Sequence, residues 1–324
     1  MLKIDKIKII SNIQNISNIN LEKFSSIIKD GRVVEQKFTI LSPYLLYIEV
    51  DIEESELVIE FSSKILLDNY PQSITKTNIQ ECLSNINDLG LCTLDIDGII
   101  KDGVVVKMDV CRDIEYDNCK GLSKSIRSCI SNYRAYPTKL VGTNITIEKN
   151  VNTKGLKRRM IVYDKLRELK KATNRRFIES LTDKQAVLDH FNGKIRFEMN
   201  LNSKEQIRQS LHISDTSLHS VLYSDANPIW DFLSNALDNG VLNTKGRSLT
   251  EFKNLLLLQY CNSDLEKVEA IVREHCSPNT HISQVMKPYR DLLAKVAKQP
   301  SATTKETLRK LLTEIVILIG ILSV

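Results

Sequence analysis

Several features that define particular protein classes are scarce or missing in this chain. Its 324 residues include only 11 glycines and 7 prolines, far too few for a collagen-like or Pro/Gly-rich disordered protein. No two of the seven cysteines form a C-x-x-C pair. This pattern excludes a disulfide-stabilised miniprotein and predicts reduced thiols in a cytoplasmic protein. A composition that is 42% hydrophobic and 26% charged is globular and sufficient for one large domain or two.

Targeting and membrane-spanning segments are also missing. Charged residues at positions 3, 5, 6 and 8 interrupt any apolar run near the beginning of the sequence, so we predict no signal peptide. The most apolar stretch, residues 315–324, is half as long as the roughly 20 residues that a membrane span requires. We interpret it as the buried stripe of a last helix and predict no membrane association.

Three ligand-binding motifs do not occur. Without G-x-x-x-x-G-K-[ST] the chain has no recognisable ATP-driven motor of its own, and without G-x-G-x-x-G it has no obvious dinucleotide site. The five histidines include no H-x-H pair and lie outside the expected strands. A metal site in this chain is therefore expected to consist of carboxylates.

Positive charge is concentrated in one part of the sequence. The net charge is only +5, but residues 154–176 contain ten Lys or Arg and two acids. A solvated helix face is one explanation of such a run, and contact with a polyanion is the other. The candidates for DNA contact are Arg158, Arg159, Arg167, Lys170, Lys171, Arg175 and Arg176.

Apolar periodicity in the centre of the chain predicts a β-α-β-β-α-β order. The expected strands are residues 104–114, 140–149, 157–165 and 194–201, with helices at 122–133 and 166–191 and a hairpin turn at 150–155. We therefore predict an α+β fold whose core is a ferredoxin/RRM-like antiparallel sheet with both helices on one face.

The pattern also predicts three parts. Residues 1–98 form an N-terminal β-rich segment packed on the core, with strands at 45–51 and 57–61 and a helix from Asn78, although the first 40 residues keep no single period. Residues 99–205 form the core itself. Residues 206–324 form a helical C-terminal domain, in which Ser248 and Glu251 have the spacing of a capping box.

One face of the predicted sheet collects groups that could perform chemistry. Strand alternation places Asp109, Tyr163, Arg196 and Glu198 opposite the apolar side chains of the same strands. A solvated sheet face would tolerate any such mixture. Converging carboxylates, however, bind a hard divalent cation such as Mg²⁺ or Mn²⁺, and a cation beside a phenol suits phosphodiester transesterification.

Two further residues lie close to the phenol in sequence. Because the pKa of tyrosine is near 10, the phenol needs help to lose its proton. Lys165 follows Tyr163 on the same strand face, and Glu168 lies within one helical turn of Lys165. Lys165 could favour the phenolate or hold a phosphate, and Glu168 could bind the metal. Alternatively, Tyr163 covers a sheet edge and Lys165 only pairs with Glu168.

Taken together, these segments resemble a known family. Residues 105–112 (VVKMDVCR), 158–168 (RRMIVYDKLRE) and 194–199 (KIRFEM) are similar, in order and separation, to motifs of the filamentous-phage gene II/X type and related phage and plasmid rolling-circle replication initiators. Residues 61–70 resemble the segment that precedes them. The resemblance covers about residues 40–215.

The resemblance implies a nicking enzyme that starts rolling-circle replication. Tyr163 corresponds to the tyrosine that becomes joined to the 5′ phosphate of nicked DNA, Lys165 and Arg196 to residues that contact phosphate. The expected Mg²⁺ or Mn²⁺ ligands are Asp109, Glu168 and Glu198. The implied partners are origin DNA and the helicase and polymerase of a bacterial host. A water-using metal-dependent nuclease and a non-catalytic DNA-binding replication regulator are the alternatives.

Overall fold

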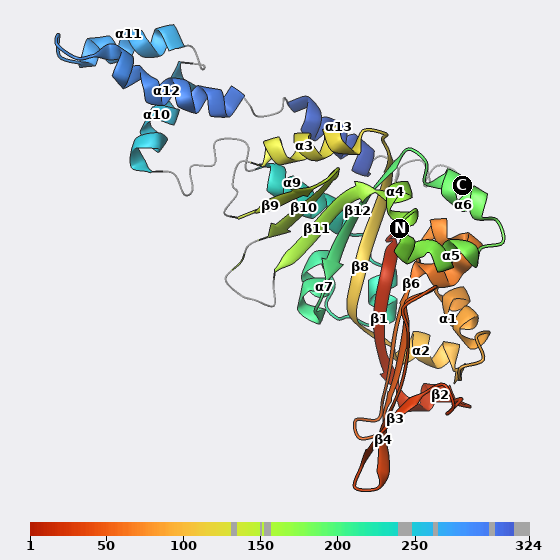
Figure 1. Ribbon diagram of the computed structural model, residues 1–324. Helices are drawn as coiled ribbons and strands as arrows, with labels where there is room; N and C mark the ends of the chain where they lie inside the picture. The colour runs from red at the N-terminus through yellow and green to blue at the C-terminus, as the bar shows by residue number, and fades with distance from the viewer. Residues whose placement is uncertain are drawn as a thin grey trace, which may run out of the picture.

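A single antiparallel sheet forms the centre of the molecule (Figure 1). The computed structural model describes residues 1–130, 135–149, 151, 157–238, 248–261, 265–297 and 302–313. Across the sheet the ten strands follow the order β3 (Ser25–Lys29), β4 (Arg32–Ile40), β5 (Leu46–Asp51), β6 (Glu56–Ser62), β1 (Ile4–Asn12), β8 (Val104–Glu115), β12 (Lys194–Leu201), β11 (Arg158–Asp164), β10 (Asn144–Lys149) and β9 (Thr138–Val141). A separate pair joins β2 (Ile16–Ser17) to β7 (Thr93–Leu94).

The N-terminal strand occupies the middle of this sheet. β1 pairs with β6 on one side and with β8 on the other, so the part before residue 99 and the part after it share one sheet. The residues for which the sequence predicted no element thus supply a central strand. The predicted boundary between residues 98 and 99 lies inside helix α2 (Ile96–Asp102).

The strand order differs from the predicted ferredoxin-like core. A split β-α-β unit needs another strand between the two strands that a helix connects. The chain between β11 and β12 is helical, yet these two strands are direct antiparallel neighbours. β8 pairs with β1 and β12 rather than with β11. The structure is therefore a mixed helical and antiparallel-sheet fold without the predicted core order, because β1 takes one of the positions beside β8.

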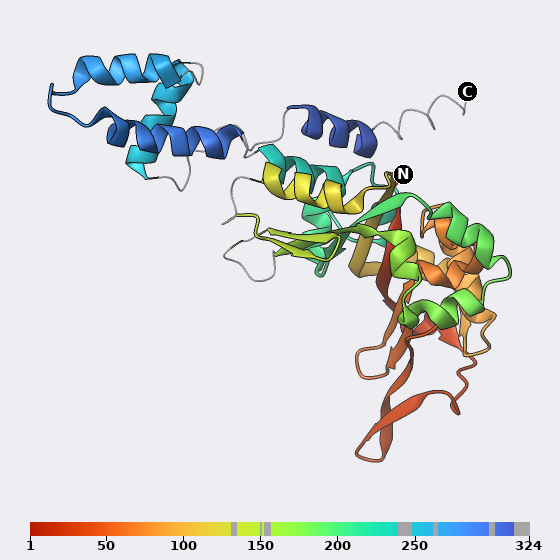
Figure 2. The same cartoon turned by 45° about the horizontal axis from the view of Figure 1, so that its top comes forward.

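Most helices cover the apolar face of the sheet. The alternating side chains Met160, Val162, Phe197 and Met199 join one buried cluster with helical residues from both halves of the chain. These helices are α1 (Ile79–Asn87), α2, α3 (Cys119–Cys129), α7 (Lys204–Leu211), α8 (Leu218–Leu222), α9 (Pro228–Asp238) and α13 (Ala302–Thr313). Figure 2 shows α3 and α13 stacked on the same side of the strands.

The predicted basic helix at 166–191 is broken into short pieces that pack on the opposite, polar face. They are α4 (Lys165–Leu169), the 3-10 turn η4 (Ala172–Asn174), α5 (Arg175–Glu179) and α6 (Lys184–His190). Their apolar side chains form a separate cluster with Tyr70 of the 3-10 segment η2 (Ser63–Gln72). The prediction that both helices of the core share one face is therefore wrong.

The described C-terminal helices form their own small cluster. α10 (Leu249–Tyr260), α11 (Leu265–His275) and α12 (Ile282–Ala297) pack against one another and lie away from the sheet in Figures 1 and 2. The backbone N–H of Glu251 donates to Ser248 Oγ at 3.1 Å, as the capping spacing predicted. The apolar stretch 315–324 and most of the turn 150–155 lie outside the described residues.

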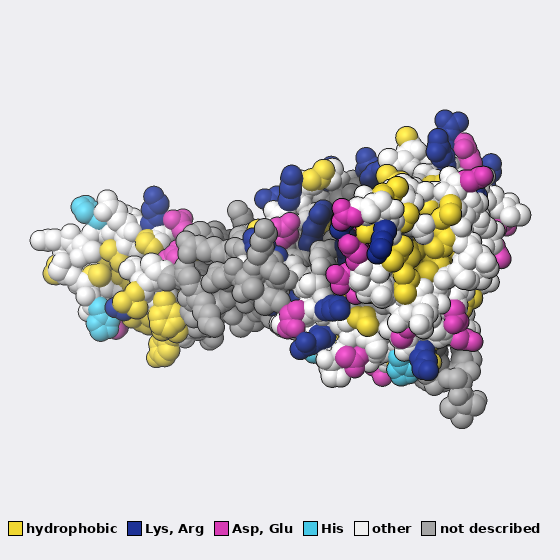
Figure 3. All heavy atoms as spheres, turned by 90° about the horizontal axis from the view of Figure 1, so that it is seen from below, with side chains coloured by type: hydrophobic (Ala, Val, Ile, Leu, Met, Phe, Trp, Pro, Cys, Tyr) yellow, Lys and Arg dark blue, Asp and Glu magenta, His cyan; other side chains and the backbone are white. Residues whose placement is uncertain are grey.

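None of the helices in the described part of the chain has both the length and the apolar character that crossing a membrane requires. The projecting β3–β4 hairpin exposes the apolar side chains Ile27, Ile28 and Val33. Figure 3 views the molecule from this end and shows hydrophobic side chains gathered among charged ones.

The central position of β1 leads to a prediction about stability. Ile7 is fully buried between Phe61 of β6 and Met108 of β8. We expect Ile7→Ala to lower the free energy of unfolding by about 2–5 kcal/mol, because it leaves a cavity in the core. The matched substitution Ile27→Ala, at a position that is 43% exposed, should cost less than about 1 kcal/mol. Urea unfolding measures both, and equal losses would contradict the central role of β1.

Candidate active site

Strand register brings the predicted site residues onto one face. Tyr163 lies opposite Arg196, and Arg196 lies opposite Asp113. Since directly opposed residues project to the same side of a sheet, the Tyr163 phenol points to the polar face. Glu198 lies two residues after Arg196 on β12, and Asp109 lies four residues before Asp113 on β8. Because side chains alternate along a strand, both carboxylates lie on the same face as Tyr163.

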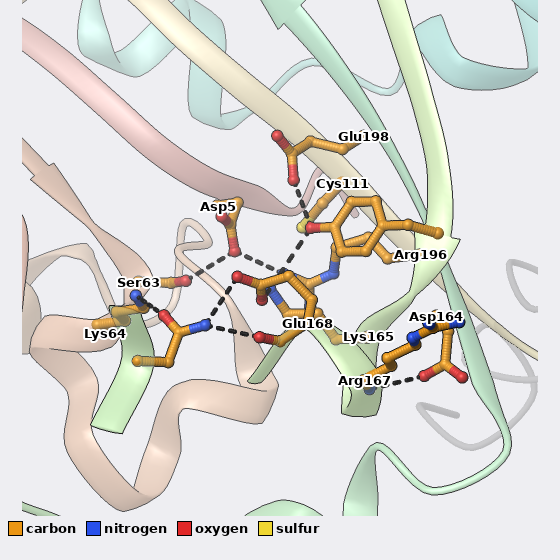
Figure 4. A network of polar contacts seen from close by, with 12 residues as sticks. Asp5, Ser63, Lys64, Cys111, Asp164, Lys165, Arg167, Glu168, Arg196 and Glu198 are labelled. Atoms are coloured by element: carbon orange, nitrogen blue, oxygen red, sulfur yellow. Dashed lines mark hydrogen bonds and ion pairs between the residues drawn. The ribbon is translucent and has the colours of Figure 1, made fainter. Parts of the chain in front are cut away.

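The phenol of Tyr163 is held between a carboxylate and an ammonium group. Its Oη donates a hydrogen bond of 2.6 Å to Glu198 Oε2, and Lys165 Nζ lies 3.5 Å from the same Oη. Tyr163 is buried, although the hydrogen bond to Glu198 is partly exposed. Figure 4 shows Glu198, Lys165 and Asp5 pointing toward one another from three different strands or strand ends.

Burial controls the protonation of this group. It raises the pKa of the Tyr163 phenol well above its usual value, an effect that Lys165 opposes and the Glu198 carboxylate reinforces. Burial and the Arg196 charge act to lower the pKa of Lys165, but the phenols of Tyr70 and Tyr163 and the Asp5 carboxylate raise it overall. The resting site therefore contains a neutral phenol beside a charged ammonium group.

Glu168 lies on the other side of Lys165. Its Oε2 is 3.3 Å from Lys165 Nζ, and its Oε1 accepts a 2.8 Å hydrogen bond from Asn174, which itself accepts one from Lys64. Burial opposes ionisation, but Lys165 and Asn174 lower the pKa of Glu168 overall. Glu168 is thus an ionised partner of Lys165 and is separated from Glu198 by the ammonium group.

Arg196 is fully buried, which differs from the predicted role in phosphate contact. Its Nε and Nη2 donate to the two carboxylate oxygens of Asp113, each at 2.7 Å, and its Nη1 donates to Asp5 at 2.5 Å. The guanidinium also packs over Phe191, 5.4 Å from the ring centroid. With no exposed surface, Arg196 orients Asp5 and Asp113 and has no atom available to a phosphate.

Three carboxylates lie on the part of the polar face beside the Tyr163 phenol, those of Glu198, Asp109 and Asp5. Burial and the nearby Asp5 carboxylate raise the pKa of Glu198 to about 7, and Asp109 contributes in the same direction. Burial also raises the pKa of Asp109, whose Oδ1 accepts a 2.8 Å hydrogen bond from Asn200. Within the described residues, no group of three or more His, Cys, Asp or Glu side chains is already arranged to hold a metal ion.

The basic residues predicted to contact DNA divide between the two faces. Arg158 bonds Gln209 of α7, at 2.7 Å, on the side opposite Tyr163. Arg159 is exposed on the Tyr163 face. The Arg167 guanidinium donates to Thr143 Oγ1 at 3.3 Å, and the backbone N–H of Arg167 donates to Asp164 (Figure 4). The others are exposed on the short helices over the polar face: Lys170, Lys171, Arg175 and Arg176.

Sequence reasoning missed several residues of the site. Asp5 comes from β1, where the pairing with β8 shifts between Ile4 and Lys6, so no strand alternation could place it. Asp113 lies in the predicted strand 104–114, but the sequence did not identify it as the partner of Arg196. Ser63, Lys64 and Asn174 come from 3-10 segments, and each bonds a site residue or its direct partner. A sequence signal for these three is absent.

Comparison with protein-family models, with curated proteins and with solved structures gives no match for this chain.

Removing the Arg196 charge should destabilise the fold strongly at neutral pH. Arg196→Met leaves the Asp5 and Asp113 carboxylates buried without their cation, which costs about 3–5 kcal/mol of unfolding free energy. Burial opposes ionisation, but nearby cations, among them Arg196, lower the pKa of both acids. Their stabilising contribution is therefore present above the unfolded-state pKa near 4 and is lost as the pH falls.

Chemical denaturation at pH 7 and pH 4 measures this effect. The cost of Arg196→Met should shrink at the lower pH, since protonated carboxyls no longer need a counter-charge. Arg175→Met is the matched control, because Arg175 is exposed and pairs with the exposed Glu179; it should change the stability by less than about 1 kcal/mol. A pH-independent cost at Arg196 would argue against the buried ion pairs.

Glu198 should titrate near neutrality. Because its folded-state pKa of about 7 lies above the unfolded value near 4.3, the folded state holds a proton that the unfolded state releases. The unfolding free energy should thus fall as the pH rises from about 4.5 to 7, by up to about 3 kcal/mol. Glu198→Gln should remove this slope, whereas Glu22→Gln, at an exposed position, should keep it. A carboxyl titration followed by NMR with a midpoint below about 5.5 would contradict the argument.

Proposed function

We propose that the chain is a metal-dependent DNA nicking and closing enzyme that starts rolling-circle replication of a phage or plasmid through a 5′-phosphotyrosyl intermediate. The observation that carries this proposal is the hydrogen bond from Tyr163 Oη to Glu198, with Lys165 3.5 Å from the same oxygen. A nucleophile, a base and a cation that stabilises the phenolate are thereby in contact. The resemblance of residues 40–215 to rolling-circle initiators supports the same assignment.

In the proposed reaction the phosphodiester is exchanged without net oxidation or reduction. Glu198 takes the phenolic proton as Tyr163 Oη attacks phosphorus, and the bond from phosphorus to the 3′ oxygen breaks. The leaving oxygen takes up a proton to give a 3′-OH for a polymerase, while the 5′ phosphate stays on Tyr163. Glu198 Oε2 already accepts the hydrogen bond of the phenol, so the proton has a direct acceptor. Attack by a 3′-OH on the phosphotyrosine reverses the bonds and closes a circle.

The donor set beside the phenol fits a hard divalent cation. Asp109 and Glu198 have no ion-pair partner among the described residues, and Asp5 lies close to Glu198. A phosphate would be repelled by these acids unless a cation neutralised them. Mg²⁺ or Mn²⁺, held by Glu198 and Asp109 with Asp5 nearby, would stabilise negative charge on the phosphate oxygens. We assign Glu168 to holding Lys165 in position rather than to the metal.

Exposed basic side chains around Tyr163 support contact with the DNA backbone. Arg159 precedes the tyrosine on the same strand face, and the exposed residues Lys170, Lys171, Arg175 and Arg176 follow it. Such contacts position a strand without reading its sequence. The enzyme would act on single-stranded origin DNA, and a helicase and polymerase of the host would separate and copy the strands.

The proposal predicts a covalent adduct that depends on one oxygen atom. With Mg²⁺ or Mn²⁺ and single-stranded DNA labelled at its 3′ end, the wild-type protein should retain label on a denaturing gel, and mass spectrometry should find the nucleotide on Tyr163. Tyr163→Phe and chelation of the metal should each abolish the adduct. Glu198→Gln should slow its formation by about 10²–10⁴-fold.

Tyr47→Phe provides the matched control. Tyr47 also donates to a glutamate, Glu49, on this sheet, but it lies outside the proposed site, so its adduct yield should equal that of the wild type. An adduct in Tyr163→Phe would refute the assignment of the nucleophile. Free 5′ phosphates from the first turnover would indicate a water-using nuclease. Metal-independent binding and intact replication in Asp109→Asn and Glu198→Gln would indicate a regulator.

A further inference from the structure

A small cavity lies on the other face of the sheet, between the ends of β10 and β11 and helices α7 and α9. Its volume is about 90 Å³, which suffices for a group larger than one water, since a water needs about 10–15 Å³. The side chains that matter for its chemistry are Lys149, Arg158 and Ser210. Tyr163 points to the opposite face of β11, so the cavity is not part of the proposed active site.

Two like charges are directly opposed in this cavity. Lys149 of β10 and Arg158 of β11 are register partners, and like charges at such positions destabilise a sheet. The next pair along, Glu148 and Arg159, has opposite charges and faces the other side. Burial lowers the pKa of Lys149, and the Arg158 charge adds to the effect. Burial also lowers the pKa of Arg158.

Two buried polar atoms in the cavity have no hydrogen-bond partner in the described structure, Arg158 Nε and Ser210 Oγ. Arg158 donates through Nη2 to Gln209 at 2.7 Å, but its Nε is buried and makes no hydrogen bond in the described structure. Ser210 is only 5% exposed, and its Oγ likewise has no partner. The one carboxylate among the lining residues, Asp231, lies 3.5 Å from His212. Buried donors without partners are costly and need an explanation.

We propose that this cavity binds a phosphoryl group, which would lie between Lys149 and Arg158 and accept hydrogen bonds from Arg158 Nε and Ser210 Oγ. A tetrahedral phosphate supplies acceptors in several directions and places negative charge, one unit for a diester and up to two for a monoester, between the opposed cations, which a neutral ligand would not do. The phosphoryl group belongs either to a small ligand such as a nucleotide or to the backbone of a DNA strand on this face. The proposal does not depend on the function assigned to Tyr163.

Calorimetric titration at constant ionic strength tests the site, with inorganic phosphate and AMP as probes. The wild-type protein should bind phosphate saturably, and Lys149→Gln and Arg158→Gln should each weaken binding about tenfold or more. Lys139→Gln, which removes an exposed lysine on the neighbouring strand β9, is the matched control and should bind as the wild type does. No saturable binding up to about 10 mM phosphate, or equal affinity in all variants, would overturn the proposal.

Ser210→Ala keeps the test valid if a charge variant fails to fold. Because it removes a buried hydroxyl that has no partner, the phosphate-free variant should unfold at the same temperature or higher. Its phosphate affinity should nevertheless fall about threefold or more. An unchanged affinity in this variant would count against the site.

Titration with a single-stranded oligonucleotide distinguishes the two sources. If the cavity takes a backbone phosphate, Arg158→Gln should weaken DNA binding and reduce its salt dependence by about one phosphate contact. If the cavity takes a small ligand, this variant should lose AMP or phosphate binding and keep its DNA affinity. Either result supports a phosphoryl site.

Discussion

The buried guanidinium of Arg196 is the interaction on which the site depends. It joins three strands, because its donors reach Asp113 on β8 and Asp5 on β1 from its own position on β12. Buried ion pairs often contribute little net stability, since desolvation offsets the attraction. Here the ion pairs of Arg196 fix the positions of the two carboxylates. Arg196 holds Asp5 at the place where that carboxylate also acts on Lys165 and Glu198.

The electrostatic balance beside the phenol follows from this arrangement. Arg196 is the close cationic partner of Asp113, and Lys165 is the close cationic partner of Glu168. Among the described residues Glu198 forms no ion pair and accepts a hydrogen bond from the neutral Tyr163 phenol, and burial and Asp5 raise its pKa to about 7 although Lys165 opposes this rise. The same burial that keeps the phenol neutral therefore also raises the pKa of the carboxylate in contact with it, although that pKa stays below the pKa of the phenol. A cation arriving with a phosphate would favour ionisation of both groups.

Alternation along single strands was sufficient to predict the polar face of the site. The period of two in residues 158–164 and 194–201 was enough to predict that Tyr163, Arg196 and Glu198 lie on one face. The strand order could not be predicted, because it depends on the long-range pairing of β1. In that strand the buried residues Ile4, Ile7 and Ile9 are spaced by three and then two, and the bulges behind this spacing conceal the strand period.

The helical excursion at 165–191 shows a second limit of the sequence pattern. Its many basic residues have good helix propensity, which favoured one long helix. Tertiary packing instead requires Leu169, Phe177 and Phe191 to converge on Tyr70, and one straight helix cannot direct all three to a single point. The resulting turns bring Asn174 to Glu168 and so hold Lys165 beside the phenol.

The two adjacent arginines of β11 show why the basic run is not one continuous surface. Consecutive strand residues project to opposite faces, so Arg159 lies beside the carboxylates of the Tyr163 face while Arg158 lies in the cavity with Lys149. A polyanion on one face can reach only one of them. The basic side chains of residues 157–176 are therefore divided between the two faces of the sheet. Occupancy of the cavity by a phosphoryl group would relieve the repulsion between β10 and β11 and so stiffen the strand that carries Tyr163.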